Sequence, residues 1–181
     1  MSDNRYQRWI DASSIVRAIE PFMVQLVQGL GRFDCHLIHE DTRFGALNQE
    51  QSLSDESNFL TDRFTLSYFW VLAAYELVRR LDQRWRTGAT TMPAEFGSRV
   101  AALKRRMERL RIPLAKMGTA HRFPTDSIMA YPTISHDFGV AWHVAQDTYI
   151  TRRELSNQLL DFLADLKKAS TVNKGLITRR S

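Results

Sequence analysis

The sequence contains little cysteine, proline and glycine, and it has no long apolar run. Its single cysteine, Cys35, excludes an internal disulfide and an all-cysteine zinc site. The longest apolar run, Leu66 to Tyr75, is shorter than the about 20 residues that cross a bilayer. The N-terminal residues are polar and lack the apolar core of a secretory signal. From these absences we expect a soluble, cytoplasmic protein with no membrane partner.

Aromatic residues and arginine are both plentiful. Four tryptophans, ten phenylalanines and five tyrosines supply enough apolar surface for a packed core, and 181 residues predict one domain over 1–181. The net charge of +5 rests on 20 arginines against 5 lysines. Arginine suits phosphate and carboxylate groups, so an anionic partner is one interpretation. A skewed genomic base composition explains the same bias.

The stretch from Phe64 to Leu81 predicts the central helix of the fold, spanning about 59–85. Its apolar residues form two neighbouring stripes at helical spacing, which a helix covered on two faces requires. The first stripe contains Leu60, Phe64, Val71, Tyr75, Val78 and Trp85, and the second contains Leu66, Trp70 and Leu77.

Before this helix, residues 1–12 predict a loose arm, and Ser13 or Ser14 begins a helix that ends at the glycines 29 and 31. Its expected apolar stripe is Ile15, Ile19, Phe22, Leu26 and Leu30. Pro21 interrupts that stripe, so we expect a kink or a short turn followed by a new helix. The polar stretch 32–58 predicts a long connection with a short extended piece at 33–39.

After the central helix, Pro93 begins an amphipathic helix that we expect to end before Pro113. The alternation of Val140, Trp142 and Val144 with smaller or polar residues predicts a strand. We expect a small antiparallel β ribbon near 127–150, with Ser127–Ile134 against Gly139–Ala145.

The last helix has a clear start. Thr151 and Glu154 match a capping box, and Ile150 and Leu155 match the hydrophobic staple beside it. The buried face is expected to contain Leu155, Leu159, Phe162, Leu163 and Leu166. Residues 170–181 carry three cations and no acid, so they predict a frayed basic tail.

The helix after Pro93 carries most of its cations on one side. Arg99, Arg105, Arg106 and Arg109 extend from one edge of its apolar stripe and form a basic flank, the candidate contact surface for nucleic acid or another anion. A solvated face and an acidic protein partner explain the same pattern. No aromatic residue interleaves these cations, as single-strand binding usually requires.

No nucleophile elbow, phosphate-binding glycine loop or dinucleotide fingerprint occurs. His36 and His39 do not enclose a glutamate, so the zinc-protease pattern is missing too. We predict no metal and no cofactor. Glu76 precedes Arg79 and Arg80 at ion-pair spacing, which favours a structural role for this carboxylate.

Arg32 and His39, with six residues between them, resemble the arginine and histidine pair of small bacterial helical HEPN domains, many of them toxin or defence ribonucleases. This likeness is one of architecture, and we assign no family from it. The alternative functional hypothesis is a metal-independent ribonuclease that uses Arg32 with His39, or Arg122 with His121. There a histidine acts as general base on a ribose hydroxyl and an arginine stabilises the phosphorane.

The sequence as a whole predicts a mainly α domain of four or five helices around residues 59–85, with the small β ribbon beside them. Because no catalytic pattern occurs, the leading functional hypothesis is a non-enzymatic interaction module for a protein or nucleic acid partner. Its contact surfaces are the basic flank and the 32–58 segment. The ribonuclease is the alternative.

Overall fold

The computed structural model describes residues 2–46, 53–90, 92–135 and 137–177. These residues form five helices and one antiparallel sheet with the strand order β1-β2-β3. The helices are α1 (Ser2–Val16), α2 (Met23–Ala46), α3 (Leu53–Arg86), α4 (Ala94–Lys116) and α5 (Arg152–Ile177). The strands are β1 (Tyr131–Ser135), β2 (Gly139–Ala145) and β3 (Thr148–Thr151). The predicted mainly α fold with a small β ribbon is confirmed.

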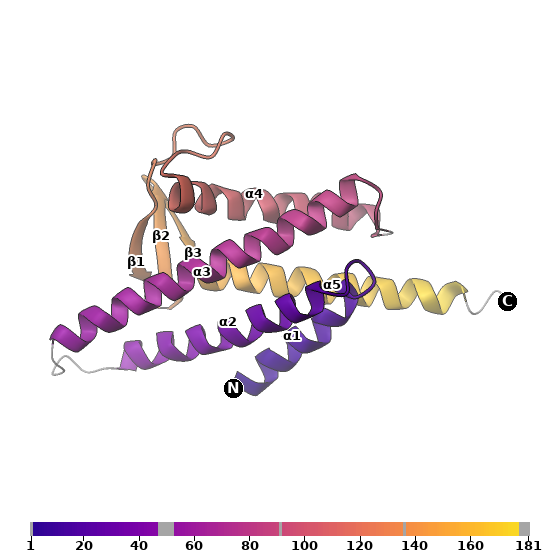
Figure 1. The fold of residues 1–181 in the computed structure, drawn as a ribbon, viewed down its shortest axis with the longest axis horizontal. Coiled ribbons are helices and arrows are strands. Elements are labelled where there is room, and N and C mark those ends of the chain that lie inside the picture. Colours follow the sequence, from indigo (N-terminus) through magenta and orange to yellow (C-terminus); the bar gives the residue numbers. More distant parts are fainter. Residues whose placement is uncertain (1, 47–52, 91, 136, 178–181) are drawn as a thin grey trace.

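Helix α3 crosses the middle of the molecule, with the α1 and α2 pair on one side and α4 on the other (Figure 1). Helix α5 packs against α1 and α4, and the sheet lies near the N-terminal end of α5. The residues Trp70, Val71, Leu77 and Val78 of α3 are fully buried. Both predicted stripes of the central helix therefore face the core, as expected.

Helix α1 occupies the place of the expected loose arm. Its apolar residues are few but correctly spaced, since Trp9, Ala12 and Val16 share one face and are all buried. The indole Nε1 of Trp9 donates a 3.1 Å hydrogen bond to Asp34 of α2. A single large side chain thus anchors a helix that is otherwise polar, and this is why the composition of residues 2–12 suggested an arm.

Helix α2 runs through Gly29 and Gly31, so the prediction that these glycines end a helix is wrong. A Cβ atom at position 31 would overlap the side chain of Trp9, and Gly31 therefore allows α1 and α2 to approach closely. The expected stripe is also wrong at Phe22, which is 83% exposed, and at Leu26, which is exposed. The turn around Pro21 separates the two helices, which removes the common phase that this stripe assumed.

The predicted connection 32–58 is wrong where the structure describes it. Residues 32–46 belong to α2, including the expected extended piece at 33–39, and residues 53–58 belong to α3. Residues 47–52 lie outside the described part of the chain. Asp34 and Asp41 occupy positions on the same helical stripe as Leu30 and Leu37, and these buried acids conceal the apolar pattern.

Helix α4 continues past Pro113 to Lys116, so the prediction that it ends before this proline is wrong. Pro113 is buried, and its packing offsets a lost hydrogen bond only one turn from the helix end. The predicted capping box of α5 is confirmed, because the backbone N of Glu154 donates to Thr151 Oγ1 at 3.0 Å. Helix α5 reaches Ile177, although a frayed tail was expected from residue 170; residues 178–181 lie outside the described chain.

The predicted strand Gly139–Ala145 is confirmed as β2, whereas the predicted strand Ser127–Ile134 is wrong for residues 127–130, because β1 begins at Tyr131. The third strand, β3, was not predicted. Trp142 of β2 pairs with Pro132 of β1 and with Ile150 of β3. The side chains of Val140, Trp142 and Val144 are buried, as the period of two predicted. Along the described ranges, every helix is too short or too polar for a bilayer span.

Candidate functional site

Most cations of α4 already have partners within the molecule. Arg99 binds Asp165 at 2.8 Å, and Arg106 lies 3.5 Å from Glu154. The remaining partnered cations are Lys104 with Asp82, Arg109 with Asp126, and Arg111 over the Tyr75 ring. Three of the four basic-flank residues are therefore paired with acids from other segments, which reduces the positive charge that this flank presents.

Arg105 and Lys116 differ from the other cations of α4. Among the described residues, neither has a carboxylate within ion-pair distance, and both are exposed. Both side chains line the same pocket, which has a volume of about 430 Å³. The cations of α4 that the fold leaves unmatched thus gather at one place.

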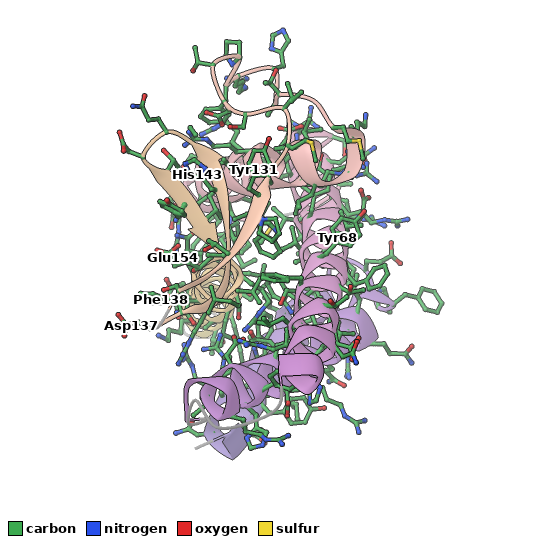
Figure 2. All side chains as sticks on the ribbon, turned by 90° about the vertical axis from the view of Figure 1, so that its left-hand side faces the viewer. Tyr68, Tyr131, Asp137, Phe138, His143 and Glu154 are labelled. Carbon is green, nitrogen blue, oxygen red and sulfur yellow. The ribbon has the colours of Figure 1, made fainter. Side chains whose placement is uncertain are left out.

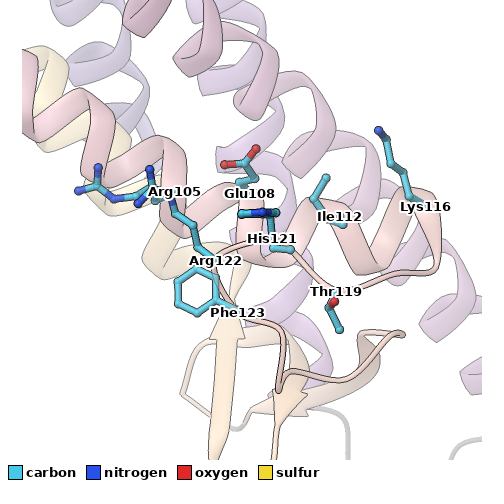
Figure 3. A pocket seen from close by; sticks show the side chains of 9 residues that line it. Arg105, Glu108, Ile112, Lys116, Thr119, His121, Arg122 and Phe123 are labelled. Carbon is cyan, nitrogen blue, oxygen red and sulfur yellow. The ribbon is translucent and has the colours of Figure 1, made fainter.

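This pocket, the α4–loop pocket, lies between the C-terminal half of α4 and the segment that follows it (Figure 3). Its lining residues are Arg105, Glu108, Ile112, Lys116, Thr119, Ala120, His121, Arg122 and Phe123. The first four are spaced at three, four and four residues, so they share one face of α4. The alternative catalytic candidates His121 and Arg122 therefore lie beside Arg105, although they are distant from it in sequence.

Arg109 holds the outer wall of the pocket in place. Its Nε and Nη2 donate to the two carboxylate oxygens of Asp126 at 2.6 and 2.9 Å, a bidentate pair. The same guanidinium lies 4.5 Å from the centre of the Phe123 ring. The hydrogen bond with Asp126 raises the pKa of Arg109 further above its ordinary value. Arg109, predicted as an anion contact, thus fixes the segment that carries His121 and Arg122.

The charge of the pocket is unbalanced. Arg105, Lys116 and Arg122 are cations, and His121 adds an imidazole ring to the same pocket. Glu108 is the one carboxylate among the lining residues. Arginine side chains offer forked donors to a phosphate, and Ile112 and Phe123 add apolar surface. This arrangement can bind an anion and can accept one hydrogen bond at Glu108.

The other predicted catalytic pair, Arg32 and His39, lies on α2. Both side chains are exposed, two helical turns apart. His36 is exposed on the same helix. The structure therefore brings together His121, Arg122 and Arg105, whereas Arg32 and His39 remain on an open helix surface away from that pocket.

Metal ligation and thiol chemistry find little support in the described chain. Among its histidine, cysteine and acidic residues, no group of three converges in a way that holds a metal ion. Burial and the nearby Asp34 carboxylate raise the pKa of the Cys35 thiol, which opposes a thiolate nucleophile. Glu76 pairs with Arg79 at 2.8 Å on the surface of α3, in agreement with its predicted structural role.

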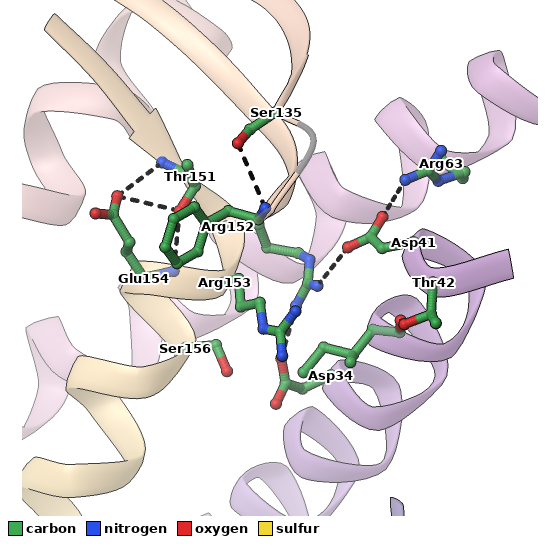
Figure 4. A network of polar contacts seen from close by, with 12 residues as sticks. Asp34, Asp41, Thr42, Arg63, Ser135, Thr151, Arg152, Arg153, Glu154 and Ser156 are labelled. Carbon is green, nitrogen blue, oxygen red and sulfur yellow. Dashed lines mark hydrogen bonds and ion pairs between the residues drawn. The ribbon is translucent and has the colours of Figure 1, made fainter. Parts of the chain in front are cut away.

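A second group of charges lies inside the helical core. This Asp34 cluster consists of Arg5, Trp9, Asp34, Asp41, Arg63, Arg152 and Ser156. Figure 4 shows five of them: Asp34, Asp41, Arg63, Arg152 and Ser156. Arg152 and Asp34 are both fully buried, with 2.6 Å between Nη1 and Oδ1. Asp41 accepts from Arg152 Nη2 at 3.1 Å and also from Arg63. Each of the two acids therefore contacts two guanidinium groups.

The Asp34 cluster joins four helices to the sheet. Arg5 binds Asp34 at 2.6 Å and Ser156 at 2.6 Å, which connects α1, α2 and α5. Gly139 has a φ of +70° and lies so close to Asp41 that a Cβ atom there would overlap its carboxylate. Buried charges of this kind are stable only when paired, so the cluster orients the helices.

The sequence contained signals for the residues that were missed. Asp34 and Asp41 occupy apolar positions of a helical stripe, which marks buried acids that need cationic partners. Arg152 follows directly after the capping-box residue Thr151, at a helix N-terminus that disfavours a cation. Glu108 and Lys116 share the helical spacing of Arg105. None of these signals identifies the partner, because each partner comes from a distant segment.

Comparison with known proteins adds nothing to these observations, since no family model, no curated protein and no solved structure matches the chain.

Proposed function

We propose that the protein is a non-catalytic binding module that holds a phosphate-bearing partner in the α4–loop pocket. One observation carries this proposal. The cations of α4 that have an internal partner lie outside the pocket, whereas the two without one, Arg105 and Lys116, both line it. A cation left without a partner next to other cations is stabilised when an anion binds.

The lining residues favour phosphate over carboxylate. Arg105 and Arg122 come from a helix and a loop, so two guanidinium forks approach the pocket from different segments. A tetrahedral phosphate offers acceptors in several directions, whereas a carboxylate offers them in one plane. Glu108 would repel a second anionic group but accepts a hydrogen bond from a hydroxyl or amino group. The pocket therefore suits a phosphate ester whose other groups are hydrogen-bond donors.

Labelled inorganic polyphosphate provides the direct test. In fluorescence anisotropy at low salt, the double variant Arg105→Glu with Arg122→Glu should bind it at least about tenfold more weakly than the wild type. The matched control, Arg17→Glu with Arg80→Glu, changes the net charge equally at two exposed sites elsewhere. Equal loss in both variants would show that net charge alone attracts the probe, and the proposal would fail.

A second function, RNA cleavage without a metal, is favoured by the position of His121 beside Arg122, Arg105 and Glu108. His121 would accept the proton of a ribose 2′-hydroxyl, and the 2′-oxygen would form a bond to phosphorus. The bond from phosphorus to the 5′-oxygen would break, and water would protonate that oxygen. The arginines would stabilise the charge of the phosphorane.

Incubation of the purified protein with mixed RNA and a chelator separates the two functions. Cleavage that His121→Ala abolishes would establish the nuclease at this pocket. Cleavage lost in His39→Ala instead would assign the reaction to the exposed pair on α2. If the RNA stays intact while polyphosphate binds, the nuclease function fails and the binding function stands.

A further inference from the structure

Three aromatic rings form a row across the sheet. Tyr131 of β1 pairs in register with His143 of β2, which pairs in register with Tyr149 of β3. The rings of His143 and Tyr149 lie 4.8 Å apart between centroids at an angle of 34°. Tyr131 is 54% exposed and Tyr149 is 57% exposed. Tyr131 and Tyr149 therefore present aromatic surface to solvent on the two outer strands, and the half-buried His143 lies between them.

The alternation of β2 places this ring row on the face away from the core. Trp142 and Val144 are buried against the helices, so His143, between them, points to the opposite side. Its Nε2 lies 3.1 Å from the carbonyl oxygen of Gln146, which holds the imidazole in place. With a strand spacing of about 4.8 Å, the row is about 10 Å long, enough for about two bases.

The ring row lies at the end of the sheet that adjoins the α4–loop pocket. The segment that forms the pocket wall reaches β1 through residues 124–130, and within this stretch the backbone N of Ser127 donates to the carbonyl oxygen of Val144 at 2.8 Å. Val144 is next to His143, and Tyr131 is the first residue of β1. Figure 2 shows Tyr131 and His143 near the end of the strands that faces this segment.

We infer that the phosphate-bearing partner is a single-stranded nucleic acid, with its backbone in the α4–loop pocket and its unpaired bases stacked on Tyr131, His143 and Tyr149. This inference rests on the proposed function. Cations that bind phosphates, together with rings that stack bases, are the two components of single-strand recognition. The rings come from the sheet, which explains why no aromatic residue interleaves the cations in the sequence of α4.

The charges near the sheet favour this orientation. Asp147, in the turn between β2 and β3, is exposed and has no ion-pair partner among the described residues. Its carboxylate would repel a phosphate placed over the rings but tolerates a neutral base. A duplex keeps its bases stacked on each other, so only a single strand can use both surfaces.

The test compares three labelled probes of equal length: single-stranded oligouridylate, an RNA duplex and inorganic polyphosphate. The variant Tyr131→Ala with Tyr149→Ala should bind oligouridylate about tenfold to a hundredfold more weakly and polyphosphate as tightly as the wild type. Tyr131→Phe with Tyr149→Phe keeps the rings and should retain oligouridylate binding. The matched control, Phe22→Ala with Phe69→Ala, removes two exposed rings elsewhere and should change neither affinity.

The outcomes distinguish this inference from the proposed function. Oligouridylate binding that is unchanged in Tyr131→Ala with Tyr149→Ala overturns the inference. If polyphosphate binding still depends on Arg105 and Arg122, that result leaves the proposed phosphate-binding pocket intact. Duplex RNA that binds as tightly as oligouridylate overturns the inference as well. If polyphosphate binding is absent or insensitive to Arg105 and Arg122, the proposed function itself fails.

Discussion

The Asp34 cluster and the α4–loop pocket are both rich in arginine, but only the Asp34 cluster pairs its arginines with acids. In the Asp34 cluster, the fully buried Arg152 contacts both Asp34 and Asp41. In the α4–loop pocket, Arg105 and Arg122 are exposed, and no carboxylate lies within ion-pair distance of either among the described residues. The pairing of charges, rather than their number, therefore separates cations that hold a fold together from cations available to a ligand.

The largest loss of stability is expected when one acid of the Asp34 cluster is removed. Asp34→Ala removes the carboxylate that accepts from Arg5, Trp9 and Arg152, and leaves a fully buried guanidinium with one acid fewer. The free energy of unfolding, measured in urea, should fall by about 3–5 kcal/mol.

A surface pair provides the control for Asp34. Asp161 pairs with Arg8 at 2.8 Å, but both side chains are about half exposed. Asp161→Ala should lower the free energy of unfolding by about 1 kcal/mol or less. If Asp34→Ala costs no more than this, the buried charges are solvated and the comparison does not hold.

A smaller effect is expected where Trp9 reaches the Asp34 cluster. Gly31→Ala adds a methyl group that overlaps Trp9, so it displaces the indole that donates to Asp34. The cost in free energy of unfolding should be about 1–3 kcal/mol.

Gly29→Ala is the matched control on the same helix, because nothing lies within 4 Å of a Cβ atom there. That variant should stabilise the protein by about 0.5–1 kcal/mol, since alanine favours a helix more than glycine does. A stabilised Gly31→Ala variant would contradict the close packing of α1 on α2.

A third prediction concerns the ion pair between Arg109 and Asp126, which holds the wall of the α4–loop pocket in place. Asp126→Ala removes the bidentate partner of Arg109 and releases the segment that carries His121 and Arg122. We expect a loss of about 1–2 kcal/mol in the free energy of unfolding and weaker polyphosphate binding. Asp161→Ala, which makes the same charge change by breaking an ion pair outside the pocket, should leave polyphosphate affinity unchanged. If both variants bind polyphosphate equally well, Asp126 does not organise the pocket.

The smallest effect is expected from pH at the exposed ion pair between Arg99 and Asp165. The hydrogen bond from Arg99 lowers the pKa of Asp165 below its ordinary value of 3.8. Because the folded pKa is the lower one, the stabilisation is complete above 3.8 and is lost as the pH falls through the folded value. Both side chains are 43% exposed, so the contribution is below about 0.5 kcal/mol. In urea titrations, the free energies of unfolding of Asp165→Asn and of the wild type should become equal only at acidic pH. A difference that persists at acidic pH would exclude this ion pair as its cause.

Local patterns in the sequence determined much of the fold. The two stripes of α3, the start of α4 directly after Pro93, the alternation of β2 and the capping box at Thr151 each arise from residues a few positions apart. Such patterns follow from the helical and strand periods alone, and they identified the central helix and the ribbon.

Long-range pairing was decided only by the tertiary structure. The helical state of residues 2–12 depends on the burial of Trp9 against α2, and the course of α2 beyond Gly31 depends on acids whose partners lie in α1, α3 and α5. The α4–loop pocket follows the same logic. The sequence by itself determined which side chains of α4 are cationic, but the folded chain decided which of them meet an acid, because a charge finds its partner in space and not along the chain.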